Sequence, residues 1–420
     1  MTWLARLASK APVPVYPAIG SHAQHAVQDL ALNPRIQWVR SPRHARVLLV
    51  AGGISPEFSA ALRRVHDQLP GPSATVWLRS TPPAELVNEA TVIDDARQFS
   101  DVANDVYRSL LQGEREGEPH LCPDEPPAPW EGLGDHGQGG EGMMGGKPYG
   151  RAMAMTADDL RDGLQLDPLS FSVGPFWPVL PPGFSAHVTL HGDVIAEIQV
   201  TSIPYPVALP AIFRQALEKP VPIAELELAR ACYHLRQLSH ALWVNGLESA
   251  SLTVLQRIHA LQPGDSLAGL RTWLRRVGFF FSAGAEKGVL GRDQAEKIGG
   301  PAARAAGIAQ DTRQDDPQYQ RLGFQVIYGH GSNCRARWQQ WLDEAEQALS
   351  LAARAREQAV CTSDCDRVET PRGVMGRGGS PSDATFVLQE LLPGLEWSEA
   401  IATIASLDLA AVSDYAEEGV

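Results

Sequence analysis

The chain has 420 residues, of which 44% are hydrophobic and 20% charged, and its 36 Lys and Arg against 49 Asp and Glu give a formal net charge of -13. This length favours two or more domains, and the composition is that of a globular protein. Proteins that bind nucleic acid usually carry a basic surface, so the acidic balance argues against nucleic acid as a partner.

No apolar run in the sequence approaches the roughly 18 residues that a membrane-spanning helix needs. The first 20 residues are only mildly apolar, contain Pro12, Pro14 and Pro17, and lack the apolar core and cleavage site of a secretory signal. We therefore expect a cytoplasmic protein. It could still lie peripherally on the inner face of the cell membrane by binding a membrane partner.

Residues 1–112 have the pattern of an α/β domain. A short apolar strand is expected at 47–53, a helix with one apolar face at 57–68, a second strand at 74–78 and a closing helix at 99–111. Because a strand, a helix and a strand follow one another, we expect the strands to form a parallel sheet.

Residues 113–160 change in character and predict a linker. The first part is rich in acidic residues and proline and the second in glycine, and neither composition can bury a core. The glycine stretch does not match a phosphate-binding loop, because Pro148 follows Lys147 and no strand precedes it. A short docking peptide at Met143 to Arg151 is an alternative to a plain tether.

Residues 161–420 predict an α+β domain that is mainly helical. Alternating residues at 184–190 and 194–200 flank a His-Gly-Asp turn and predict a β-hairpin near its start. Apolar residues at spacings of three and four predict a buried helix, or two, at 223–261. Further helices are expected at 334–360 and 397–404.

The cysteines are few and scattered. Their odd number argues against a disulfide framework, and no CxxC pair exists. Cys361 and Cys365 would share a face if helical, so they are weak candidates for a redox pair or half of a metal site. Two soft ligands alone do not make a metal site, and we predict none. The five cysteines are Cys122, Cys232, Cys334, Cys361 and Cys365.

Several short sequence motifs in residues 15–80 resemble the B-type subunit of respiratory complex I, which is related to the small subunit of nickel–iron hydrogenases. In order they are Ser41-Pro42-Arg43-His44-Ala45, the strand from Val47 to Gly52, and Ala60-Ala61-Leu62-Arg63-Arg64-Val65 ending at Gln68-Leu69-Pro70. The resemblance implies that residues 1–112 are a B-subunit-like domain.

Short sequence motifs spread over about 240 residues of the second domain resemble the D-type subunit of complex I, which is related to the hydrogenase large subunit. In order they are Gly174-Pro175, Ser239-His240-Ala241-Leu242, Gly288-Val289-Leu290, Gly300-Pro301, Arg304, Gly307, Asp311-Thr312-Arg313, Asp316-Pro317-Gln318-Tyr319, Arg335, Glu344, Glu369-Thr370-Pro371-Arg372-Gly373 and Ala402 to Asp408. The resemblance implies a fusion of two quinone-module subunits.

The cofactor ligands that these families use are missing. A B-type subunit holds a [4Fe–4S] cluster on four cysteines, expected near 18–22, at 79–82 and later, yet residues 1–112 contain no cysteine. Hydrogenase large subunits hold nickel and iron on two CxxC motifs, and this chain has neither. We therefore expect no cofactor, neither a [4Fe–4S] cluster nor a nickel–iron centre.

The quinone-binding residues implied by the D-type resemblance are also changed. Trp177 stands where the family has a histidine that contacts the quinone headgroup, and residues 247–262 lack the partner tyrosine. We interpret Trp177, His240 and Asp408 as a degenerate quinone pocket without catalytic residues.

Two charged residues of the signature loop belong to the same interpretation. Glu369 and Arg372 would shape the pocket in a D-type subunit, and a plain alternative is that they form buried ion pairs that hold loops together.

Three functions remain open. The first is a structural, redox-inactive scaffold in a complex-I-like or membrane-hydrogenase-like assembly, whose partners would include other subunits and a membrane subunit. The second is an active quinone oxidoreductase subunit with altered ligands, as the resemblance to NADH-quinone oxidoreductase alone would imply. The third is an assembly factor for a hydrogenase or for the complex itself.

Overall fold

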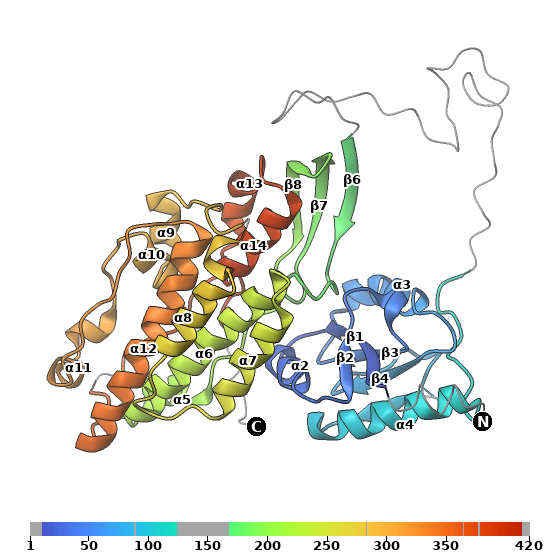
Figure 1. Ribbon diagram of the computed structural model, residues 1–420, viewed down its shortest axis with the longest axis horizontal. Helices are drawn as coiled ribbons and strands as arrows, with labels where there is room; N and C mark the ends of the chain where they lie inside the picture. The colour runs from blue at the N-terminus through green and yellow to red at the C-terminus, as the bar shows by residue number, and fades with distance from the viewer. Residues whose placement is uncertain are drawn as a thin grey trace, which may run out of the picture.

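The computed structural model describes residues 11–87, 90–123, 168–282, 284–363, 365–376 and 379–413. In these residues an α/β domain lies beside a larger, mainly helical domain that carries a small sheet (Figure 1). The expected linker from residue 124 on, including the segment from Met143 to Arg151, lies outside the described residues.

The α/β domain is built on one parallel sheet, as the sequence predicts. Its strand order is β2-β1-β3-β4-β5, and every neighbouring pair is parallel. The central strands β3 and β4 are buried on both faces, which explains why Thr75 is their one polar residue. The elements are β1 (Val13–Ile19), α2 (Gln24–Leu30), β2 (Ile36–Trp38), η1 (Pro42–His44), β3 (Val47–Ala51), η2 (Pro56–Phe58), α3 (Ser59–Asp67), β4 (Ala74–Leu78), β5 (Thr91–Ile93), η3 (Ala96–Gln98) and α4 (Phe99–Gln112).

Helices cover both faces of this sheet. The apolar sides of α2 and α4 share one buried cluster with the inward side chains of the strands, whereas α3 packs in a separate cluster on the other face. Phe99, Ala103, Val106 and Leu110 place the buried side of α4 at helical spacing. Gly113 ends α4 in the left-handed conformation, with φ of 73°.

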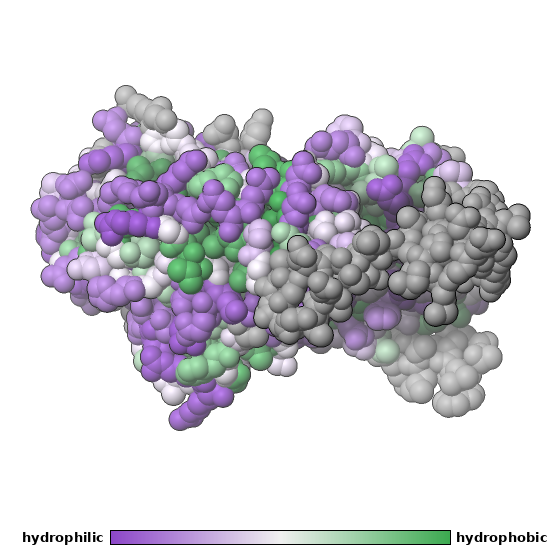
Figure 2. All heavy atoms as spheres, turned by 90° about the horizontal axis from the view of Figure 1, so that it is seen from above, coloured by the Kyte–Doolittle hydropathy of each residue, from purple (hydrophilic) through white to green (hydrophobic). Residues whose placement is uncertain are grey.

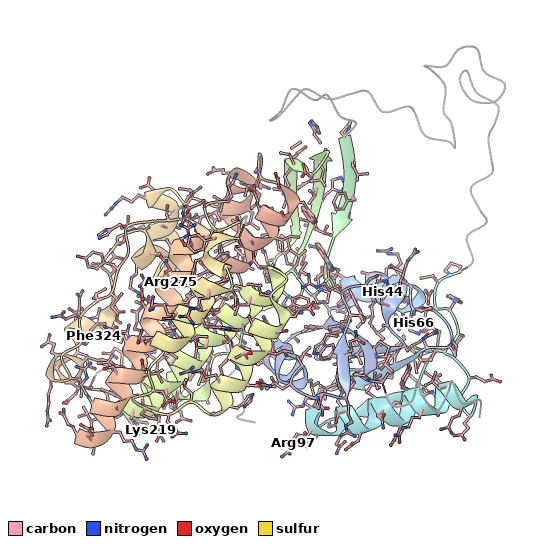
Figure 3. All side chains as sticks on the ribbon, viewed as in Figure 1. His44, His66, Arg97, Lys219, Arg275 and Phe324 are labelled. Atoms are coloured by element: carbon pink, nitrogen blue, oxygen red, sulfur yellow. The ribbon has the colours of Figure 1, made fainter. Side chains whose placement is uncertain are left out.

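The segment after α4 belongs to the α/β domain, although the sequence predicts a linker from residue 113. The Glu118 carboxylate accepts hydrogen bonds from the Thr75 backbone N–H at 2.8 Å and from the Thr75 hydroxyl at 2.7 Å. It also lies 3.1 Å from Nε2 of His66 on α3, a residue that is labelled in Figure 3. Burial opposes protonation of His66, but Glu118 and Asp67 outweigh it and raise its pKa. Residues up to Cys122 are therefore held on the domain.

The second domain begins with three antiparallel strands in the order β6-β7-β8. The predicted hairpin is confirmed as β7 and β8, and β6 adds a strand at its edge. The elements are β6 (Pro168–Val173), β7 (Ser185–His191), β8 (Val194–Ser202), α5 (Ala211–Glu218), α6 (Ile223–Val244), α7 (Glu248–His259), α8 (Ala268–Arg276), η5 (Phe279–Phe281), α9 (Arg292–Ile298), α10 (Gly300–Ala305), η6 (Thr312–Asp315), α11 (Pro317–Arg321), α12 (Cys334–Gln358), β9 (Arg367–Thr370), β10 (Gly373–Gly376), η7 (Thr385–Val387), α13 (Leu388–Leu391) and α14 (Trp397–Leu407).

The long helices α6 and α12 pack along one another at the centre of this domain. The apolar run at 223–261 forms two helices rather than one, because α6 ends before Gly246, whose φ of 80° is incompatible with a continuing helix. Both α6 and α12 are buried on more than one side, since α7, α10 and α14 pack around them.

No described helix combines the length and the apolar character that crossing a bilayer would need. The face seen from above is a mosaic of hydrophilic and hydrophobic residues rather than one continuous apolar surface (Figure 2).

Candidate functional site: the seam between the domains and the buried charges behind it

Aromatic side chains join the two domains. The buried hydroxyl of Tyr16, on β1, donates a hydrogen bond of 2.7 Å to the backbone carbonyl of Phe176, and burial raises the pKa of Tyr16. Phe176 and Tyr205 of the helical domain each meet Phe58 edge to face, at centroid distances of 6.2 and 5.9 Å. The Ser55 backbone N–H donates to the Tyr205 hydroxyl at 3.1 Å. The loop that carries Gly174 and Pro175 is thus inserted into the α/β core.

Charged side chains close the same seam. Arg236 of α6 donates two hydrogen bonds to the two carboxylate oxygens of Asp29 on α2, at 2.7 and 3.0 Å, and His259 lies 3.2 Å from the same carboxylate. Arg40 donates to the Glu248 carboxylate at 3.2 Å and to the backbone carbonyl of Trp243 at 2.9 Å. A bidentate arginine–carboxylate pair fixes orientation as well as contact, so the domains meet in a defined geometry.

A cavity of about 310 Å³ lies between the two domains. Its walls are largely apolar, with a few amide, hydroxyl and imidazole groups, which is the usual character of a pocket for a small organic molecule. The α/β domain contributes α2, β2 and the ends of β1, and the helical domain contributes residues 178–182, α6 and α7. The lining includes Ile19, Gln24, Val27, Gln28, Ala31, Ile36, Gln37, Trp38, Pro178, Leu180, Ser239, His240, Trp243, Ser251, Leu252 and Leu255.

His240 is the imidazole of this cavity. Its ring stacks on Trp243 with centroids 6.2 Å apart, and burial lowers its pKa to about 4. It is therefore neutral at neutral pH, with one ring nitrogen able to donate and the other able to accept. The neighbouring Ser239 hydroxyl lies 2.9 Å from the Ser251 hydroxyl and donates to the Ser251 carbonyl at 3.0 Å.

The structure separates the three residues that the sequence suggests as a degenerate quinone pocket. Only His240 lines the cavity. Trp177 turns away from it and stacks on Trp397, with centroids 5.9 Å apart. Asp408 lies in the helical domain, where its carboxylate accepts from the Tyr233 hydroxyl at 2.8 Å.

Behind the seam, a network of buried charges fills the centre of the helical domain. Arg304 of α10 donates two hydrogen bonds to the Glu344 carboxylate, at 2.8 and 2.9 Å, and one to Glu369 at 2.9 Å, and it lies 3.4 Å from Asp311. Burial opposes the charge on Arg304, but these three carboxylates outweigh it and raise its pKa. The same arginine holds the pKa of Glu344 well below its usual range against the effect of burial.

The network continues through Arg313. This side chain donates to both Asp311 oxygens, at 2.9 and 2.7 Å, and to Glu227 of α6 at 3.0 Å. Arg230 lies 3.1 Å from the same Glu227 carboxylate, which also accepts from the Tyr319 hydroxyl at 2.6 Å. The charged side chains of the network are at most 4% exposed, so only their mutual pairing makes their burial tolerable.

The signature loop belongs to this arrangement. Glu369 accepts from Arg304 and also from the Thr312 backbone and hydroxyl, both at 3.1 Å, so it ties the loop to η6. Arg372 lies 3.2 Å from the Asp408 carboxylate and donates to the Ala410 carbonyl, which ties the loop to the end of α14. The cavity beside this pair is only about 10 Å³.

The side chains at the positions expected for the cluster do not fit a [4Fe–4S] cluster. The loops after β1 and β4 place Ser21, His22 and Arg79 around the space in question, and none of them offers a thiolate. Cys122 lies on the segment beside Asp67, whose carboxylate accepts from its backbone N–H.

Among the described residues, no group of three or more His, Cys, Asp or Glu side chains is arranged to hold a metal ion. Cys361 is exposed and follows α12, and Cys365 is half-buried just before β9. These two residues therefore do not share a helical face, and the expectation that they bind no metal stays a prediction.

Sequence reasoning missed the seam cavity and the reach of the charge network. The cavity depends on how two separate domains meet, which no local pattern encodes. One feature of the sequence could have indicated the network. The motifs that resemble a D-type subunit include four of its charged residues among apolar residues that predict burial, namely Arg304, Arg313, Glu344 and Glu369.

Comparisons with known proteins point to the same segment. The family described as "Respiratory-chain NADH dehydrogenase, 49 Kd subunit" matches residues 275–375, which contain five members of the buried network (Arg304, Asp311, Arg313, Glu344 and Glu369) as well as Arg372. Its match does not reach Trp177, His240 or Asp408.

Individual relatives agree with the family match. The chain is 33% identical over 110 residues to the D 2 subunit of NADH-quinone oxidoreductase from Salinispora tropica, which is 25% of this chain and 27% of that protein. It is 32% identical over 102 residues to the same protein of Salinispora arenicola (23% and 25%) and 37% identical over 75 residues to that of Sinorhizobium medicae (17% and 19%). The chain thus spans about a quarter or less of the length of these relatives, and this part of it is similar to the D-type subunit of NADH-quinone oxidoreductase.

Proposed function

We propose that this chain is a structural, redox-inactive subunit of a complex-I-like or hydrogenase-related assembly, in which a B-like and a D-like domain are fused. The similarity to D-type subunits of NADH-quinone oxidoreductase supports the D-like half. The proposal of a B-like half rests on the sequence motifs in residues 15–80 and on the parallel sheet.

One observation carries the redox-inactive part of the proposal. The B-like domain presents glycine, serine, histidine and arginine where a cluster would need thiolates, while hydrogen bonds and ion pairs join it to the D-like domain. Without a cluster beside the seam, no electron donor stands next to the cavity. The chain then serves to join partners, which we expect to include a membrane subunit at the inner face of the cell membrane.

The test is purification of the tagged full-length chain from the cells that produce it, under mild detergent, with identification of whatever accompanies it. We expect stoichiometric recovery with other complex-I-like or hydrogenase-like subunits, one of them a membrane protein, and iron and nickel near zero by elemental analysis. Recovery of the chain alone would overturn the proposal. Its presence in a precursor but not in the mature complex would instead make it an assembly factor.

A second candidate function rests on the seam cavity. An apolar space of about 310 Å³ with a neutral imidazole in its wall suits a quinone headgroup, so the chain could be a quinone oxidoreductase subunit with altered ligands. Trp38 and Trp243 line the cavity, and decylubiquinone bound there should quench their fluorescence.

Ala31→Phe would fill the cavity and should abolish saturable quenching if the quinone binds there. Ala224→Phe, on a half-buried position of α6 away from the cavity, is the matched control. Absence of saturable quenching in the unmodified chain eliminates this second candidate and leaves the scaffold proposal standing.

A further inference from the structure

A second cavity, of about 230 Å³, lies at the carboxyl edge of the parallel sheet. The loops that follow β1, β3 and β4 form its walls, together with the first turn of α2. Small side chains, among them Ala23 and Ala26, leave the space open. It is separate from the seam cavity, with which it shares no lining residue.

The position of this cavity in the topology is that of a ligand site. The chain leaves β1 through α2 on one face of the sheet and returns at β2, whereas it leaves β3 through α3 on the other face and returns at β4. The strand order therefore reverses between β1 and β3. Ligands of open parallel sheets bind in the crevice outside the carboxyl ends of the strands at this reversal, and the loops after β1 and β3 are the ones that line the cavity.

The backbone around the cavity is held in uncommon conformations. Four described residues other than glycine have positive φ, and two of them, His22 at 59° and Arg79 at 49°, line this cavity. Gly52 lies between their loops with φ of 81°. Such conformations cost free energy in residues with a side chain and gather at ligand sites, where the surrounding structure fixes them.

The charge in the walls has one sign. Arg79 and His22 are the ionisable side chains among the lining residues, and no lining side chain is a carboxylate. The Arg79 Nε donates a hydrogen bond of 2.7 Å to the Asp94 backbone carbonyl, which holds the guanidinium at the edge of the cavity. The Asp95 carboxylate is close enough to Arg79 to interact with its charge, but it pairs with Arg97 and does not line the cavity, so the lining itself is basic and favours an anion.

We propose that this pocket binds a small phosphate-bearing anion. Arg79 would contact the phosphate oxygens through its charged guanidinium, and the exposed backbone of Gly53 lets the ligand approach the loop closely. The compact apolar floor formed by Leu78 and the alanines leaves room beyond the phosphate for a small organic group. This ligand site goes beyond the proposed scaffold function and does not depend on it.

The test is titration calorimetry on the full-length chain with inorganic phosphate and with pyrophosphate, in a phosphate-free buffer at constant ionic strength. We expect saturable binding with one site per chain. Arg79→Gln should weaken it at least tenfold, because a charge-assisted hydrogen bond is replaced by a neutral one. Arg108→Gln is the matched control, since Arg108 is exposed on α4 of the same domain and does not line the cavity.

A second variant removes space rather than charge. Ala26→Phe should abolish phosphate binding by filling the pocket, and it keeps the test decisive if Arg79→Gln folds poorly. The proposal is overturned if the unmodified chain gives no saturable heat, if Ala26→Phe binds as the unmodified chain does, or if Arg79→Gln and Arg108→Gln weaken binding equally, because equal losses indicate an unspecific charge effect.

Discussion

The carboxyl edge of the sheet and the centre of the helical domain differ in what occupies their space. At the sheet edge, alanine, glycine and serine side chains surround an opening of about 230 Å³. In the helical domain, four carboxylates and three arginines occupy the centre; the cavity beside Arg313 and Glu369 is about 70 Å³ and the one beside Arg372 and Asp408 about 10 Å³. The resemblance predicts lost ligands in both places, but only the second place has long side chains that pair with one another. Side-chain length and charge pairing, rather than the loss itself, decide whether space stays open.

The largest effect should come from breaking the filled region. Arg304→Met keeps an unbranched stem but leaves Glu344 and Glu369 buried without their counter-ion, which should lower the free energy of unfolding by about 3–5 kcal/mol. Urea unfolding of the full chain measures it. The control is Arg271→Met, whose partners Asp343 and Glu346 are partly exposed and which should cost below about 1 kcal/mol. Equal losses in the two variants would contradict the idea of a paired, filled core.

The second largest effect should be the loss of stability in acid that comes from His240 in the seam cavity. Because the folded-state pKa of His240 is about 4, below its ordinary value of 6.5, the unfolded chain takes up this proton first as the pH falls. The stability present above pH 6.5 is therefore lost between pH 6.5 and 4, by at most about 3 kcal/mol from this group. His240→Gln cannot be protonated and should flatten that part of the stability curve. The surface variant His330→Gln serves as control, and a curve that His240→Gln leaves unchanged would refute the burial of His240.

A smaller effect is expected at the contact between the domains. Asp29→Asn removes the acceptor charge for Arg236 and His259 and should cost about 1 kcal/mol, because the pair is bidentate and only partly exposed. Asp101→Asn removes the more exposed partner of Arg35 within the α/β domain and should cost almost nothing. If thermal unfolding ranks these two variants in the reverse order, the seam contact contributes less than its geometry implies.

The smallest effect is expected at the open pocket. Arg79→Gly relieves the positive φ of 49° but loses the hydrogen bond to the Asp94 carbonyl, so the two changes should offset each other to within about 1 kcal/mol. Thermal unfolding measures the outcome. A loss as large as that of Arg304→Met would mean that the sheet edge is a structural core and would remove the contrast between the two regions.

Much of the fold could be predicted from the sequence where elements are long or wholly apolar. β3, β4, α4, the β7–β8 hairpin and α12 all follow from local periodicity and turn residues. The three-residue strands β2 and β5 could not be predicted, because a strand of that length is defined by its neighbours rather than by its own residues. The short helix α10 likewise packs against α12, and α9 packs against α10.

The candidate site could be predicted only in part. His240 lines the seam cavity and Glu369 lies in the buried network, but Trp177 packs in a different core, where it stacks on Trp397. Glu118 fixes a segment that reads as linker, since its acidic and proline-rich composition conceals one buried carboxylate with two hydrogen-bond donors on β4. Both outcomes depend on residues far away in the sequence.

The seam cavity has a consequence for how the molecule unfolds. Its walls come from both domains, so a molecule that occupies it is bound by the docked pair and by neither domain alone. Occupancy therefore adds its binding free energy to the docking of the domains. A chain that would otherwise melt in two steps, one for each domain, should then melt in a single step, so that the cooperativity of unfolding itself reports whether the cavity is filled.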